Sequence, residues 1–106
     1  MTRKKKKHIN KKKISKDCWD LDYAFYNWLR ERLPVYLKEA GEVVDLTYYK
    51  FKDFNGEEKT QEEIIKRMIV LVNYLLSDYL AWTEEYDKAH DELMYLWTTV
   101  SRAMWW

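Results

Sequence analysis

Apolar side chains recur every three or four residues from Thr60 to Trp106, a stretch that contains neither Gly nor Pro. This spacing is typical of one face of an α-helix. Thr60 and Glu63 form a capping-box pattern, which predicts that a helix begins at this point. The residues of the stripe are Ile64, Met68, Leu71, Leu75, Tyr79, Trp82, Tyr86, Ala89, Leu93, Trp97, Val100 and Met104.

An unbroken helix over this stretch would be long for a chain of this size. About 45 residues at 1.5 Å per residue would span about 67 Å. Polar residues between Ser77 and Thr83 therefore predict a break, and Thr83, Glu84 and Glu85 supply a second N-terminal signature. The alternative is one long helix whose overhang pairs with another copy of the chain, so a homodimer stays open.

An earlier apolar stripe predicts a helix over 17–40. Asp17 suits the N-cap position, because its side chain can accept a hydrogen bond from the first turn. Pro34 interrupts the helix, but the apolar register continues through it, so we expect one kinked helix. Gly41 is expected to end it as the C′ residue. The residues expected to be buried are Leu21, Phe25, Trp28, Leu29, Leu33, Tyr36, Leu37 and Ala40.

Residues 42–59 change in character, because branched and aromatic side chains gather around the turn signal Asn55-Gly56. A short β-hairpin is the prediction, and an extended loop is the competing outcome. The expected fold is mainly α: a three-helix body (17–40, 60–77 and 83–104) with a small β-hairpin or loop near 46–59. A basic arm precedes this body.

The chain has 106 residues, a length typical of a single domain, and its charge is divided unevenly along the sequence. Residues 1–16 hold nine Lys or Arg and no acid, whereas residues 17–106 hold ten bases and eighteen acids. The sequence thus predicts a flexible arm (1–16) and an acidic, aromatic-rich domain (17–106).

The arm carries the residue type that binds phosphate. Its cations would contact a nucleic-acid backbone, or an acidic patch on a partner, and release counterions. No aromatic residue lies among them, so we expect no base stacking. The alternatives are a solvating tail, an arm that folds onto its own acidic body, and a membrane-surface contact, which the lack of an apolar anchor disfavours. The candidate residues are Arg3, Lys4, Lys5, Lys6, Lys7, Lys11, Lys12, Lys13 and Lys16.

Two further features are candidates for protein contact. The last helix carries Glu84, Glu85, Asp87, Asp91 and Glu92 on its outer face, which is either an ordinary solvated surface or a surface for a basic partner. Trp105 and Trp106 close the chain, and terminal residues usually fray. They must therefore dock into the core, which we favour, or anchor a partner.

Catalytic and metal-binding patterns are nearly missing from the sequence. His90 has Asp87 three residues before it, a spacing more typical of a structural pair than of a catalytic base. Cys18 is the single cysteine and has no assigned histidine partner. The two glycines cannot form a phosphate-binding loop. We expect a protein that is not an enzyme, with no cofactor, metal or membrane span, in a cytoplasmic setting.

The stretch CWDLDYAFYNWLRERL, the capped TQEEIIKRMIVLV segment and the final MWW resemble a pattern in short phage and prophage proteins of Gram-positive bacteria. The resemblance covers about residues 18–106, and the long lysine arm and the Asn55-Gly56 turn depart from it. It implies a small phage accessory protein of the non-enzymatic binding type, including anti-defence and anti-CRISPR inhibitors, and it implies no particular site residues.

Two functions follow as expectations. In the first, a phage-type interaction protein binds a host protein–nucleic-acid machine in the host cytoplasm and inhibits it. In the second, a nucleic-acid-binding or packaging accessory protein acts through its polybasic arm, and the body is a dimerising scaffold.

Overall fold

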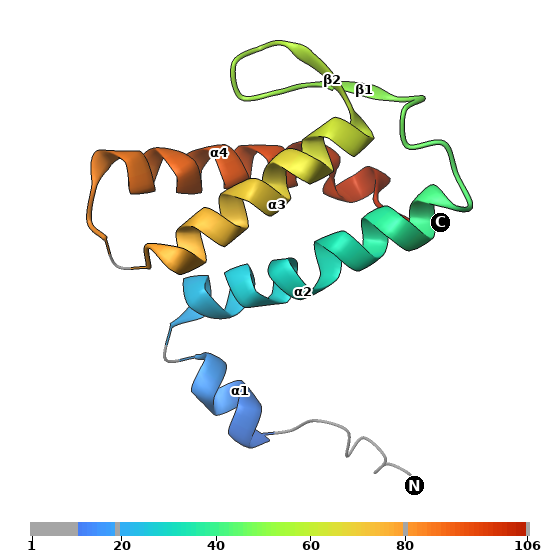
Figure 1. Ribbon diagram of the computed structural model, residues 1–106. Helices are drawn as coiled ribbons and strands as arrows, with labels where there is room; N and C mark the ends of the chain where they lie inside the picture. Colours follow the sequence, from blue (N-terminus) through green and yellow to red (C-terminus); the bar gives the residue numbers. More distant parts are fainter. Residues whose placement is uncertain (1–10, 19, 80, 106) are drawn as a thin grey trace, which may run out of the picture.

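The computed structural model describes residues 11–18, 20–79 and 81–105. Over these residues the chain is mainly helical, with one two-stranded antiparallel sheet (Figure 1). This architecture confirms the predicted three-helix body with a small hairpin. The elements are α1 (Lys11–Asp17), α2 (Leu21–Gly41), β1 (Lys50–Lys52), β2 (Glu58–Thr60), α3 (Gln61–Ser77), α4 (Glu84–Val100) and a 3₁₀-helix (Ser101–Ala103).

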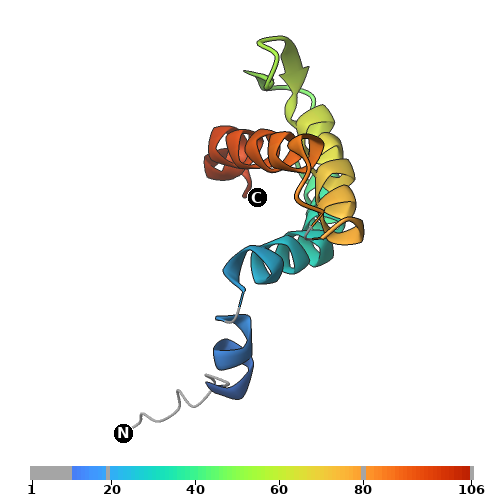
Figure 2. The same ribbon diagram turned by 90° about the vertical axis from the view of Figure 1, so that its left-hand side faces the viewer.

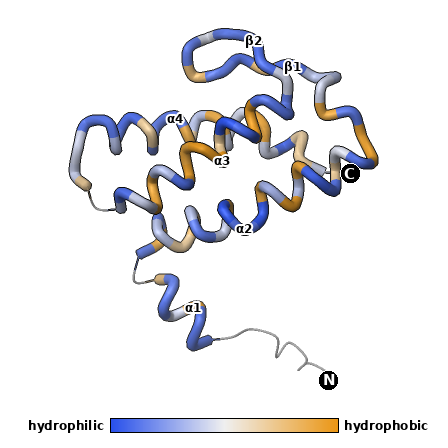
Figure 3. The backbone as a smooth tube through the Cα atoms, in the orientation of Figure 1, coloured by the Kyte–Doolittle hydropathy of each residue, from blue (hydrophilic) through white to orange (hydrophobic). Residues whose placement is uncertain are grey.

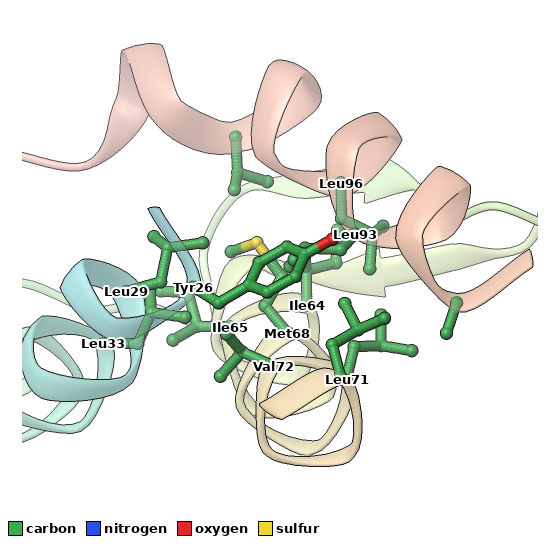
Figure 4. Packing of buried hydrophobic residues seen from close by; sticks show 13 residues of the cluster. Tyr26, Leu29, Leu33, Ile64, Ile65, Met68, Leu71, Val72, Leu93 and Leu96 are labelled. Carbon is green, nitrogen blue, oxygen red and sulfur yellow. The ribbon is translucent and has the colours of Figure 1, made fainter. Parts of the chain in front are cut away.

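The middle of the core is supplied by α3, on which both α2 and α4 pack. Figure 2 shows α2 and α4 extending from the same side of α3, with the C-terminal segment between them. Hydrophobic positions are prominent along α3, whereas α1 is mostly hydrophilic (Figure 3). The buried cluster contains Tyr26, Leu29, Leu33, Ile64, Ile65, Met68, Leu71, Val72, Leu75, Ala89, Leu93, Leu96 and Val100 (Figure 4).

Two predictions about α3 and α4 are confirmed. Thr60 and Glu63 form the capping box: the Thr60 side chain accepts from the Glu63 amide, and the Glu63 carboxylate accepts from the Thr60 amide. The helix then ends at Ser77, and the Thr83 side chain caps α4 by accepting from the Tyr86 amide. The alternative prediction of one long helix over residues 60–104 is therefore wrong.

Trp82 departs from the predicted stripe, because 85% of it is exposed. It lies in the connection between α3 and α4 and has a left-handed φ of 55°. Helical spacing does not apply across this connection, so the apolar periodicity does not carry Trp82 into the core.

The ends of α2 differ from the prediction. Asp20 is the N-cap and accepts from the Tyr23 amide at 3.1 Å, whereas Asp17 is the last residue of α1. The helix runs without a break through Pro34 and bends near its middle in Figure 1. Gly41 is the final helical residue and not a left-handed C′ residue; Glu42 caps the end in the right-handed region.

The structure confirms the predicted turn at Asn55-Gly56, and the side chain of Asp53, the first residue after β1, holds it. β1 and β2 pair with Phe51 opposite Lys59. Gly56 takes the left-handed conformation, with φ 82°. The Asp53 carboxylate accepts from the amides of Asn55 and Glu57, each at 2.9 Å. These bonds satisfy the backbone of a five-residue turn, which two strands of this length could not hold alone.

The second part of the predicted flexible arm is helical in the structure. α1 begins at Lys11, and the Lys13 ammonium lies 3.6 Å from the Asp17 carboxylate one turn later. None of its residues is buried. The rest of the predicted arm, residues 1–10, lies outside the described residues.

Candidate interaction surfaces

Aromatic side chains bridge α2 and α4. The ring of Phe25 lies 6.4 Å from that of Trp28 in a stacked pair, and both rings meet Trp97 of α4 edge-on, at 5.8 and 6.1 Å. Phe25 and Trp97 are half-buried, but 45% of Trp28 is exposed. The rings are therefore held in place on one side and open on the other.

The same face of α2 continues towards its C-terminal end. The Arg32 guanidinium lies 4.8 Å from the centre of the Trp28 ring. Val35 is exposed one turn further on. The Tyr36 hydroxyl donates to the Trp105 carbonyl at 3.4 Å, which places the C-terminal segment against this face. We call the set Phe25, Trp28, Val35, Tyr36, Trp97 and Trp105 the aromatic surface.

This arrangement corrects the predicted buried stripe of α2. Leu21 and Trp28 are exposed, and the buried residue at this level is Tyr26. The helix carries two apolar series. The series at 26, 29, 33, 37 and 40 faces the core, and the series at 21, 28 and 35 faces outwards. The regular spacing of the first series was the signal that could have identified Tyr26.

Trp105 does not dock into the core as expected, because 73% of it is exposed. Its backbone is fixed by Tyr36, and the Gln61 side chain donates to the Ala103 carbonyl at 3.2 Å. The chain end is thus tied down through its backbone, and the indole is left outside. Trp106 lies outside the described residues.

The acidic face of α4 is present over its first two turns. Glu84, Glu85, Asp87 and Asp91 are exposed and, with Lys88, line a shallow hollow of about 490 Å³.

Glu92 does not belong to this face. It is half-buried and accepts two hydrogen bonds from the Arg67 guanidinium, at 2.7 and 2.8 Å. This bidentate pair raises the pKa of Arg67 and ties α4 to α3.

The predicted nucleic-acid contacts lie partly on α1. Lys11, Lys12, Lys13 and Lys16 are all exposed there, and three of them line a cavity between α1 and α2. The other predicted cations, Arg3, Lys4, Lys5, Lys6 and Lys7, lie outside the described residues.

His90 has a different partner from the one that its sequence neighbours indicated. Its Nδ1 lies 2.6 Å from the hydroxyl of Tyr26, and Asp87 points to the acidic hollow. Tyr26 is 1% exposed, and its burial raises the pKa of the phenol far above its ordinary value. The pair therefore joins α2 to α4 inside the body through one hydrogen bond.

Other groups that could carry chemistry are scattered. Cys18 is exposed beyond the end of α1. Within the described residues, no three His, Cys, Asp or Glu side chains gather closely enough to hold a metal ion.

Comparison with family models, with curated proteins and with solved structures finds no match to this chain. None of the described helices combines the length and the apolar character that a bilayer span requires.

Proposed function

We propose that this chain is a non-enzymatic binding protein whose body contacts a partner protein through the aromatic surface. The cations of its arm contact the nucleic-acid backbone of the same partner complex. The observation that carries the proposal is the exposure of Trp28, Val35 and Trp105, with the Trp28 ring held by Phe25 and the Trp105 backbone held by Tyr36.

Energetic reasons support this use of the surface. Tryptophan side chains contribute strongly to binding when a partner excludes water from them. Rings that are already oriented lose little conformational freedom on binding. Exposed apolar patches on proteins commonly mark binding sites, whereas isolated exposed residues need no such explanation.

The acidic face of α4 supplies a second contact. Glu84, Glu85, Asp87 and Asp91 would oppose a basic partner protein, of the kind that itself binds nucleic acid. We further propose, from the sequence resemblance alone, that the complex is a host protein–nucleic-acid machine and that the binding is inhibitory, as in anti-defence proteins of phages.

A second candidate is a nucleic-acid-binding or packaging accessory protein that acts through its basic arm. The observation that favours it is α1, a protruding helix whose four lysines are all exposed. In this case the arm supplies the affinity and the body pairs with another copy.

The protein-binding proposal can be tested by site-specific photo-crosslinking. A benzophenone amino acid is placed at Val35, which is 51% exposed on the aromatic surface, or at Val70, which is 57% exposed on α3. The two positions have the same residue type and similar exposure, so Val70 is the matched control. Each full-length protein is irradiated in a Gram-positive bacterial lysate, and the products are identified by mass spectrometry.

We expect one protein to crosslink at Val35 and not at Val70, and to persist after nuclease treatment. Reversing the charge of Glu84 and Glu85 should weaken its capture. Equal products at both positions would contradict the protein-binding proposal. Products that disappear with nuclease would favour the accessory protein instead.

A further inference from the structure

A cavity of about 820 Å³ lies between α1 and the N-terminal half of α2. Lys12, Lys13 and Lys16 line it from α1, and Tyr23, Trp28 and Arg32 line it from α2. Cations and aromatic rings thus face one another across one space, although they are separate in the sequence.

We propose that this cavity binds single-stranded nucleic acid, with bases stacked on the α2 rings and phosphates on the α1 lysines. Proteins that hold single strands combine these two features: a positively charged track and aromatic side chains on which bases stack. The proposal deepens the nucleic-acid contact of the proposed function and rests on it: Trp28 then contacts the strand, and Val35, Tyr36 and Trp105 are left for the partner protein. It also revises the expectation that the cations bind backbone without base stacking.

The rings of the cavity are oriented before any ligand binds. Trp28 is supported by Phe25 and Trp97 and keeps 45% of its surface exposed. Tyr23 packs against Tyr79 with ring centres 4.9 Å apart and is 46% exposed. Each ring therefore presents an open area at a small cost in side-chain entropy.

Arg32 extends the stacking area. Its guanidinium lies over Trp28, 4.8 Å from the ring centre. A guanidinium plane is itself a surface on which nucleic-acid bases stack, and its charge attracts phosphate. A base can therefore lie on Arg32 above Trp28 or replace it on the ring.

The lining of the cavity carries four cations and three carboxylates. Lys13 pairs with Asp17 at 3.6 Å, and Arg32 with Glu31 at 3.2 Å. Asp20 caps α2 and adds a third negative charge to the lining. Among the described residues, Lys12 and Lys16 have no salt-bridge partner.

A single strand suits this arrangement better than a duplex does. The bases of a duplex are stacked on one another and present only their edges in the grooves, so Tyr23 and Trp28 would have no open base to contact. The lysines alone would bind duplex and single strand alike through counterion release.

The test uses the full chain and fluorescence anisotropy with labelled 12-mers: oligouridylate, oligothymidylate and a mixed-sequence duplex. Titrations are made between 50 and 300 mM salt. We expect both single strands to bind more tightly than the duplex. The two single-stranded arms distinguish RNA from DNA as the preferred source of the strand.

The aromatic part is tested by Trp28→Ala, which should weaken single-strand binding at least about fivefold, the loss of one stacked base. Trp28→Phe keeps a flat ring and should retain most of the binding. Tyr48→Ala, which removes a ring that is 72% exposed outside the cavity, is the matched control and should have no effect. A thermal melt of each variant establishes that it is folded.

The charged part is tested by the double substitution Lys12→Gln and Lys16→Gln. It should lower the slope of log affinity against log salt by about 1.4, because each single-strand phosphate contact contributes about 0.7. The matched control is Lys66→Gln with Lys88→Gln, two exposed lysines of α3 and α4. This pair should leave the slope unchanged.

Three results would overturn the proposal: no binding at 50 mM salt, duplex affinity equal to single-strand affinity, or a folded Trp28→Ala variant that binds as the parent does. None of them requires the partner protein. A crosslink at Val35 that survives while the oligonucleotides fail to bind would remove the cavity proposal and leave the protein-binding surface in place.

Discussion

The hydrogen bond between Tyr26 and His90 gives the sharpest test of how α2 and α4 are joined. Tyr26 is 1% exposed, and its hydroxyl lies 2.6 Å from Nδ1 of a half-buried imidazole. Tyr26→Phe removes this bond, and water can reach the half-buried ring, so the cost is about 1 kcal/mol. His90→Ala removes the same bond, and the buried hydroxyl keeps its hydrogen bond with Tyr86, so the cost is also about 1 kcal/mol.

The double variant should be less destabilised than the two single variants together. Each single variant already removes the one bond between Tyr26 and His90, so a coupling energy of about 1 kcal/mol is expected. Urea unfolding followed by circular dichroism measures each free energy of unfolding. Tyr48→Phe, at a residue that is 72% exposed, is the control and should change it by less than about 0.5 kcal/mol.

A coupling energy within about 0.3 kcal/mol of zero would refute this account of the pair, because unlinked sites add to that accuracy. The loss of stability at alkaline pH supplies a second check. The pKa of Tyr26 is raised, so its contribution to stability is complete below the ordinary tyrosine pKa and falls as pH rises above it. Tyr26→Phe should reduce the loss of stability in this alkaline range.

Three further substitutions test other parts of the fold. Arg67→Ala should lower the free energy of unfolding, measured in urea, by about 1 kcal/mol. Arg67→Lys should restore less than half of that loss, because a lysine cannot make the bidentate bond to Glu92. Full restoration of stability by Arg67→Lys would contradict this explanation. Gly56→Ala should lower the melting temperature, because an Ala in the left-handed conformation costs about 1 kcal/mol of stability. Gly41→Ala should raise or maintain the melting temperature, because Gly41 is helical and the nearest atom to an added Cβ, in Leu46, is 3.7 Å away. The opposite order of melting temperatures would be inconsistent with the two backbone conformations. The Thr60 backbone amide donates to the Glu63 carboxylate and holds the pKa of Glu63 below its ordinary value, so the contribution of this group is present above the ordinary pKa and lost as pH falls through the lower folded one. Glu63→Gln, which removes the titrating carboxylate, should remove this loss of stability at acid pH in pH-dependent melts, and an unchanged loss would contradict it.

The helices of the body could be predicted because their signals are local. The capping box at Thr60, the polar break before Thr83 and the turn at Gly56 each depend on neighbouring residues, and the structure contains all three. The end of α2 at Gly41 was ambiguous, since Gly both terminates helices and is tolerated as their last residue.

The faces of α2 could not be predicted with the same success, because burial depends on which helices pack around it. Apolar residues cover more of its surface than α3 alone can bury. Leu21 and Trp28 therefore remain exposed, while Tyr26 reaches the core through its bond to His90. The position of α1 beside Trp28 is likewise tertiary, so the sequence showed the lysines and the rings as unrelated features.

The most direct test of the central claim, that the exposed face of α2 beside α1 binds single-stranded nucleic acid, is nitrogen-15 NMR with unlabelled oligouridylate. We expect the largest shift changes at the Trp28 indole N–H, at the amides of residues 23–32 and at Lys12 and Lys16. Val70 on α3 should remain unchanged. Changes centred on the acidic face at Glu84–Asp91, or spread evenly over all exposed lysines, would contradict the claim.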